Sequence, residues 1–287
     1  FAYTIPAIFI SLNLTGNPLT GRLHLADLPG REIALPANGS VTVTSDFPLP
    51  EGTRNAVRTG TPARITDADG TLIGLSSFLF DAAPCVHALD RPVSIDADTA
   101  EWEADEWHAF DAGNARAEFA VRVNAGQLYL AMRAVDPVLS FEQLPRIWHN
   151  SDGFELYLDT RDEAQLNTPG PVFQLGFFPA KDADNPLVVA PGFGAPKTGL
   201  EAVKTAWKQT GDGYVIEVVV PLAMFGASEW AEGRRIGFGL GCNDVAAPGE
   251  PRTQYQWTGN LQNYRSPVAY GWLRRGPGPV AWRVRVQ

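Results

Sequence analysis

Three aspartates within residues 136–159, Asp136, Asp152 and Asp159, carry the hard oxygen atoms that calcium prefers as ligands. The same carboxylates can instead accept hydrogen bonds from nearby backbone amides and cap turns. Turn capping is the preferred interpretation, and a structural calcium ion is the alternative that stays open. No organic cofactor is expected.

Other segments resemble known ligand-binding or catalytic motifs but do not match them. The stretch 192–198 looks like a phosphate loop, but Pro196 stands where a glycine is needed. Asp67-Ala68-Asp69-Gly70 begins like a calcium loop and lacks the downstream glutamate, which indicates a turn. The four histidines, His24, His87, His108 and His149, lack metal-ligand spacing, which favours surface or packing roles. The sequence contains neither the zinc-protease motif His-Glu-x-x-His nor the nucleophile motif Gly-x-Ser-x-Gly.

Composition narrows the class of protein. The formal net charge of −9 argues against a nucleic-acid partner. No apolar run approaches the ~20 residues of a membrane-spanning helix, so no membrane partner is expected. Cys85 and Cys242 are too few for a disulfide scaffold; they could pair with each other, but two buried apolar residues are the preferred interpretation. The chain opens on Phe1 without a visible signal peptide, as expected of a mature or excised segment.

The elements that position these residues are expected to be short β-strands. Apolar and polar residues alternate with period two in many runs, and 23 prolines leave little room for long helices. The sequence therefore predicts an all-β protein built from antiparallel sandwiches. Composition changes near residue 90, because all eight tryptophans lie beyond residue 100. Residues 1–89 are predicted to form a small Ig-like β-sandwich and residues 90–287 a larger β-sandwich.

From residue 90 onward, short motifs follow one another in a distinctive order. The series is 95–98, 101–102, 120–123 with 128–131, 135–139, 152–159, 213–217 with 220–221, 236–238 with 243–244, Arg252, 256–257, 264–267 and 270–271. This series resembles the family 9 carbohydrate-binding modules over residues 90–275. The resemblance implies a jelly-roll-like antiparallel β-sandwich related to DOMON domains, a sugar held between two aromatic side chains, and structural calcium.

The resemblance also assigns residues. It implies that Glu155 accepts hydrogen bonds from sugar hydroxyls and that Tyr264 is one of the two aromatic residues. The other aromatic residue falls on or beside His149, with Trp148 as the substitute. An arginine of the family has no equivalent, because the segment that begins at Gln174 occupies its strand. Further ligand-binding candidates are Gln174 and the amide residues before the second aromatic, Asn260, Gln262 and Asn263.

This mixture of side chains suits a sugar. A pyranose has apolar C–H faces that stack on aromatic rings and a polar rim that carboxylates and amides can bind. A structural alternative is that Glu155, between Phe154 and Leu156, is simply the solvent side of an amphipathic strand.

The expected function is non-catalytic binding of a polysaccharide or oligosaccharide. The expected setting is a secreted, periplasmic or cell-surface protein in which a catalytic domain is attached. A structural spacer or adhesion domain with a degenerate pocket is the main alternative. A glycoside hydrolase or lyase is a weaker alternative. A chain with 32 carboxylates always offers pairs of acids suited to acid/base catalysis, so their presence is not evidence for it. A haem-binding DOMON domain would need Met132 or Met224 as a ligand, and packing explains Met132 better.

Overall fold

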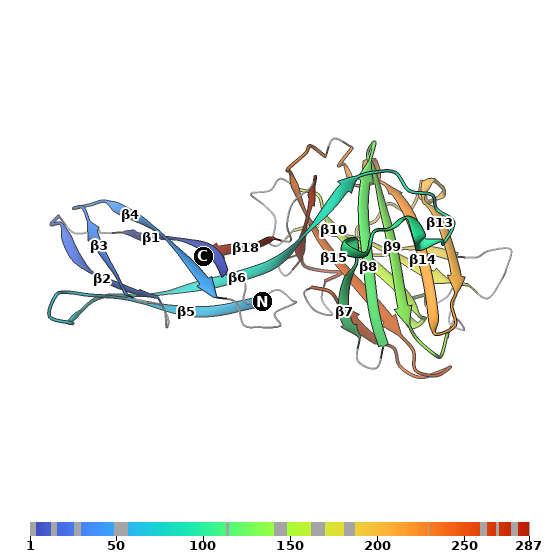
Figure 1. The fold of residues 1–287 in the computed structure, drawn as a ribbon, viewed down its shortest axis with the longest axis horizontal. Coiled ribbons are helices and arrows are strands. Elements are labelled where there is room, and N and C mark those ends of the chain that lie inside the picture. Colours follow the sequence, from blue (N-terminus) through green and yellow to red (C-terminus); the bar gives the residue numbers. More distant parts are fainter. Residues whose placement is uncertain are drawn as a thin grey trace. The chain divides into compact units, whose positions relative to one another are not determined.

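The computed structural model describes residues 4–12, 16–25, 30–48, 57–112, 115–140, 148–161, 170–180, 187–228, 230–258, 263–267, 270–276 and 281–286. Its regular elements there are β-strands and short 3-10 helices, which confirms the all-β class (Figure 1). Nothing among the described helices has the length and apolarity needed to cross a membrane.

The chain divides into two compact units. The first comprises Phe1–Ala83 with Trp282–Gln287, and the second comprises Pro84–Ala281. The strands of the first unit are β1 (Thr4–Leu12), β2 (Leu19–Leu25), β3 (Arg31–Leu35), β4 (Ser40–Pro48), β5 (Val57–Thr66), the first part of β6 (Leu72–Asp90) and β18 (Ala281–Val286). The boundary expected at residues 89 and 90 and the packing boundary at Ala83 both fall within β6. The sequence did not indicate that β18 pairs with β6.

The first unit contains two groups of paired strands. β1 pairs with β4, while β3, β2, β5 and β6 follow one another in a second group. Asp67, predicted to form a turn, does so between β5 and β6, where its Oδ1 accepts from the amides of Asp69 at 3.0 Å and Thr71 at 2.8 Å. The Ig-like character of this unit stays a prediction.

The second unit is a β-sandwich. Its further strands are β7 (His108–Ala112), β8 (Ala115–Asn124), β9 (Gln127–Val135), β10 (Gly153–Asp159), β11 (Phe173–Pro179), β12 (Leu187–Pro191), β13 (Lys204–Gln209), β14 (Gly213–Pro221), β15 (Arg235–Asp244), β16 (Thr253–Gln256) and β17 (Gly271–Arg275). Short 3-10 helices join them: η1 (Thr99–Glu101), η2 (Ala104–Glu106), η3 (Trp148–Asn150), η5 (Leu200–Ala202) and η6 (Leu222–Phe225).

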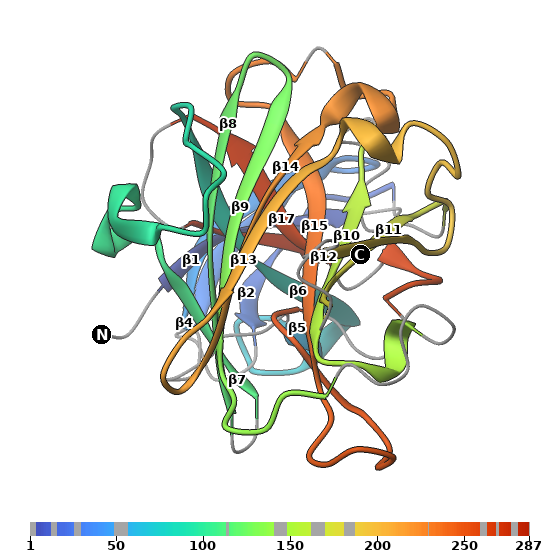
Figure 2. The ribbon, with the colours of Figure 1, turned by 90° about the vertical axis from the view of Figure 1, so that its right-hand side faces the viewer.

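The strands of this unit form two layers that β6 links. One layer has the order β12-β11-β10-β15-β17 and the other the order β8-β9-β14-β13 (Figure 2). The end of β6 pairs in parallel with β17 on one side and β8 on the other. β8 and β9 form a hairpin, and Ala125 and Gly126 at its turn have φ of 47° and 77°.

The core lies between the two layers. Phe119 of β8 packs against Phe238 of β15 and against Trp257, with ring centroids 5.6 and 5.2 Å apart. The alternation in β10 places Phe154, Leu156 and Leu158 in this core. The opposite face of β10 therefore carries Glu155, Tyr157 and Asp159. Met132 is fully buried in the core, as packing predicts.

A segment containing η1 and η2 covers the outer face of the β8–β9–β14 layer. Trp102 packs on the small side chains of Ala120 and Ala131. Its Nε1 donates to Glu217 Oε1 at 2.7 Å, and Glu217 Oε2 accepts from the amide of Ala97 at 2.7 Å. This buried carboxylate anchors the segment because it satisfies donors that packing removes from water.

Candidate functional site

Glu155 lies on β10 between two glycines. The register pairs Glu155 with Gly176 of β11 on one side and with Gly241 of β15 on the other. Because neither neighbour has a side chain, longer polar groups from the surrounding strands can reach the Glu155 carboxylate. Side chains lie over Gly241, since a β-carbon on this residue would lie 2.9 Å from Gln256 Nε2.

Four donors converge on the Glu155 carboxylate. Oε1 accepts from Asn243 Nδ2 at 2.8 Å and from Arg252 Nη1 at 3.0 Å. Oε2 accepts from Tyr157 OH at 2.6 Å and from Gln174 Nε2 at 2.6 Å. Glu155 is 1% exposed, so its interpretation as the solvent side of a strand is wrong. Burial and the Glu155 charge raise the pKa of Tyr157, so this hydroxyl stays protonated and donates.

Amide groups extend this network. Gln254 Nε2 donates to Asn243 Oδ1 at 2.7 Å and lies 3.3 Å from the Tyr157 hydroxyl. Gln174 Oε1 accepts from the amide of Phe193 at 3.0 Å. Each amide therefore has its orientation fixed by a second contact, which is the arrangement that reads hydroxyl groups with low entropic cost.

Aromatic side chains border the network. Trp148 in η3 packs against Phe178, with centroids 5.3 Å apart, and a β-carbon on Gly176 would lie 3.0 Å from its Cζ3. Tyr264 is half-buried and packs with the cluster that contains Tyr157. Trp148 therefore borders the Glu155 face near Gly176, and Tyr264 borders it near Tyr157.

Neighbours already occupy part of the Tyr264 ring. The Arg265 guanidinium lies over it at 4.9 Å, and Phe193 meets it edge-on with centroids 6.2 Å apart. A ligand that stacks on Tyr264 must therefore use the ring surface that Arg265 and Phe193 leave open, or displace one of them.

The remaining predicted binding residues differ in their roles. His149 is exposed, and its carbonyl accepts from Asn243 Nδ2 at 3.2 Å; partial desolvation and Arg252 lower its pKa. Asn263 is 2% exposed, and its Nδ2 donates within the chain to Gln256 Oε1 at 2.9 Å and to the Thr258 carbonyl at 2.7 Å. Asn260 and Gln262 lie outside the described residues.

Sequence reasoning missed Tyr157, Asn243, Arg252 and Gln254. Tyr157 follows Glu155 by two residues, so the period-two pattern of β10 already placed both on one face. Asn243 and Gln254 are paired with each other across β15 and β16, a register that the sequence does not reveal.

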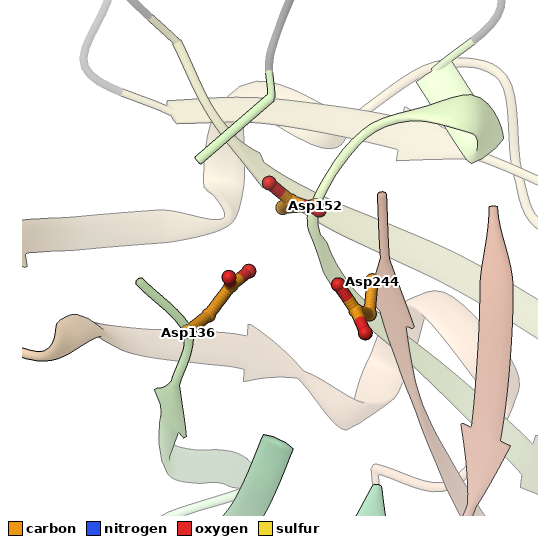
Figure 3. Close-up of side chains that lie close together, drawn as sticks. All are labelled: Asp136, Asp152 and Asp244. Carbon is orange, nitrogen blue, oxygen red and sulfur yellow. The ribbon is translucent and has the colours of Figure 1, made fainter. Parts of the chain in front are cut away.

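A second polar cluster consists of Asp136, Asp152 and Asp244. One carboxylate oxygen from each lies within 4.8 Å of the others, and the side chains converge from separate segments (Figure 3). The predicted third aspartate, Asp159, does not join them. It lies at the far end of β10, where its Oδ2 accepts from Arg161 Nη2 at 2.7 Å. Asp244 takes its place.

Both interpretations of these aspartates find support in the geometry. Asp136 Oδ1 accepts from the amide of Val138 at 3.0 Å, which is turn capping. Asp152 Oδ1 accepts from the amide of Val245 at 2.7 Å, and its Oδ2 accepts from the amide of Ser140. Burial raises the pKa of Asp136 to about 6 and of Asp152 to about 7.

The donor set of this cluster fits a divalent cation. No Lys or Arg among the described residues is ion-paired with any of the three aspartates. Three close carboxylates without a cation repel one another, and a hard divalent cation bound by oxygen ligands relieves that repulsion.

The fold is similar to that of solved carbohydrate-binding modules. A family 9 module from Caldicellulosiruptor kristjanssonii in complex with cellotriose is 17% identical, with a TM-score of 0.54 over 68% of this chain and 95% of that chain. The structure described as a family 9 module from that organism in complex with glucose is 16% identical, with a TM-score of 0.54 over 68% of this chain and 97% of that chain. No curated protein matches the chain.

A family model extends the likeness from fold to sequence. The model described as carbohydrate family 9 binding domain-like matches residues 93–274, more than half of the chain. The match lies within the second unit and includes Glu155, the aspartate cluster and Tyr264. The chain belongs to the carbohydrate family 9 binding domain-like family.

Proposed function

We propose that the second unit binds a carbohydrate, without cleaving it, on the face of β10 and β15 around Glu155. Non-catalytic carbohydrate binding is the function of the family to which the chain belongs. Four donors converge on the Glu155 carboxylate, whose neighbours on the adjacent strands are Gly176 and Gly241. This arrangement supports the location. Trp148 and Tyr264 at its border supply the aromatic surface on which a sugar ring stacks.

A glucose-type sugar is the proposed ligand class. The related modules were solved with cellotriose and with glucose. The charges of Glu155 and Arg252 offset each other at 3.0 Å, so the centre of the face carries no net charge from this pair. A neutral sugar with many hydroxyl groups suits such a surface, because amides and a guanidinium can bind its oxygens without burying a new charge.

Isothermal titration with glucose and cellotriose tests the proposal. We expect binding to the wild-type protein and a loss of about tenfold in Trp148→Ala and Tyr264→Ala, the scale of one aromatic contact. Tyr129→Ala, in the other layer, is the control and should bind as the wild type does. Absence of heat with these sugars and with a wider glycan panel would favour the spacer alternative.

We also propose that Asp136, Asp152 and Asp244 hold a structural calcium ion. The support is the uncompensated cluster of three carboxylates, two of them buried. When bound, calcium supplies the positive charge that lets these carboxylates stay ionised side by side. Titration of chelator-treated protein with calcium chloride should show one site, and magnesium should bind more weakly because it demands a tighter octahedral shell. A titration without calcium-dependent heat would contradict the site.

The setting of the chain is a further proposal. We propose that it belongs to a secreted, periplasmic or cell-surface protein and acts beside an attached catalytic domain that degrades polysaccharide. The family resemblance supports this. The neighbouring domains of the full-length protein, together with fractionation of the producing cells, test it; a cytoplasmic protein without a carbohydrate-active neighbour would contradict it.

A further inference from the structure

The Glu155 carboxylate has no spare acceptor capacity. Each oxygen already accepts two hydrogen bonds, from Asn243 and Arg252 on Oε1 and from Tyr157 and Gln174 on Oε2. An ionised carboxylate offers about four lone-pair positions. The side chain is also only 2% exposed. A sugar hydroxyl can therefore reach Glu155 only by displacing one of these donors.

Arg252 is the donor of this set that reaches the surface. Its side chain is 28% exposed, whereas Tyr157, Gln174 and Asn243 are buried. It enters the face just before β16, whose residues pair with β15. The family has an arginine on the strand that corresponds to β11, where this chain has Gln174. β11 lies on one side of β10, and β15 lies on the other.

The guanidinium of Arg252 is held in place through one nitrogen. Nη1 donates to Glu155 Oε1 and to Asn243 Oδ1, both at 3.0 Å. Asn243 Oδ1 also accepts from Gln254, so the acceptor itself is fixed. The hydrogen bonds that Arg252 forms with described residues use Nη1 alone, which leaves Nε and Nη2 available.

We infer that Arg252 makes the direct charged contact with the sugar and that Glu155 is a positioning residue that orients Arg252. The oxygens of a neutral sugar accept hydrogen bonds from the outward N–H groups of the guanidinium. Glu155 keeps its four partners when the sugar binds. This inference rests on the proposed function and changes which residue determines specificity.

A double-mutant cycle separates this arrangement from direct binding by Glu155. Titration with cellotriose compares wild type, Arg252→Met, Glu155→Gln and the double variant. We expect Arg252→Met to lower affinity about tenfold to a hundredfold, the range of hydrogen bonds from a charged donor. Glu155→Gln should lower affinity when Arg252 is present and add less than about a twofold loss when it is absent.

The double variant also guards against misfolding. Arg252→Met leaves Glu155 as a buried charge without its ion partner, whereas the double variant removes both charges together. Thermal unfolding of each variant shows which ones are folded at the titration temperature, and the cycle is measured below the lowest midpoint. Arg116→Met, an exposed arginine of β8 in the other layer, is the control and should not change affinity.

The ligand offers an independent readout. Replacing a sugar hydroxyl with hydrogen removes donor and acceptor, whereas replacing it with fluorine removes the donor and keeps a weak acceptor. At the position that Arg252 contacts, we expect deoxyfluoroglucose to bind more tightly than deoxyglucose. Under direct binding by Glu155, which needs the hydroxyl as a donor, both analogues should lose affinity equally.

The outcomes distinguish the two proposals. A wild-type protein that binds no sugar refutes the proposed function and this inference together. Wild-type binding that is unchanged in Arg252→Met refutes the inference alone. An equal loss from Glu155→Gln in both backgrounds also refutes it, because Glu155 would then act without Arg252.

Discussion

Replacing Asp244 with asparagine is expected to stabilise the calcium-free protein and to remove its response to calcium. Oxygens of Asp136, Asp152 and Asp244 lie within 4.8 Å of one another. At an effective dielectric constant of about 20, two unit charges at this separation repel by about 3 kcal/mol. Asp244 is only half-buried, so solvent screening reduces the net gain on removing its charge to about 1–2 kcal/mol.

The assay is thermal unfolding with excess chelator and then with excess calcium, at a pH above about 8 so that Asp136 and Asp152 are ionised. In a domain of this size, about 1–2 kcal/mol corresponds to a rise of about 2–8 °C in the calcium-free variant. Calcium at a hundredfold excess over its Kd stabilises the wild type by about 2.7 kcal/mol, a further shift of about 5–10 °C. The variant should show little of that shift.

Asp159→Asn is the matched control. It also removes one carboxylate charge, but Asp159 pairs with Arg161 away from the cluster. This variant should lose stability and keep the full calcium-dependent shift. A calcium-free Asp244→Asn protein that melts below the wild type, or a wild type that melts at the same temperature in chelator and in calcium, would refute the reasoning.

Three further outcomes are expected. Burial lowers the pKa of His108 to about 4, so the stability that its neutral form gives above pH 6.5 is lost as pH falls toward 4. His108→Phe should gain about 3 kcal/mol relative to wild type between pH 7 and pH 4 in urea unfolding, and parallel curves would contradict this. Trp102→Ala should lower the free energy of unfolding by about 3–5 kcal/mol, because it removes the side chain that packs on Ala120 and Ala131. A loss below about 1 kcal/mol would show that Trp102 does not anchor the segment with η1 and η2. Gly176→Ala should weaken sugar binding and lower the free energy of unfolding by about 1–3 kcal/mol, because its β-carbon would lie 2.3 Å from Phe178 and 3.0 Å from Trp148. Gly211→Ala is the control, since a β-carbon there meets open space. Equal sugar affinity of the two variants would refute the role of Gly176.

The local pattern of the sequence was enough to predict the all-β class and several elements. Alternation in residues 154–158 reports which side chains share a face of a strand, whatever the strand pairs with. The turn between β8 and β9 also depends on local chemistry, because Gly126 readily adopts the positive φ that the tip of a tight hairpin requires.

The candidate site was predictable only in part. The resemblance identified Glu155, and the structure places Trp148, Gln174 and Tyr264 around its face. Two of the three aspartates of the cluster, Asp136 and Asp152, were predicted from the sequence. Asp152 and Asp159 bracket one strand, and seven residues of extended chain span about 23 Å, so one ion cannot bind both. That argument was available from the sequence once the strand was recognised.

Tertiary structure alone decided the rest. Arg252, Asn243 and Asp244 reach their clusters because β15 pairs with β10 and β16 pairs with β15. The return of β18 to β6 is likewise a pairing between distant segments. Periodicity fixes the face on which a side chain lies but carries no information on which strand lies alongside or in which register. Those choices depend on the packing of the whole sandwich, and they determine which charges meet.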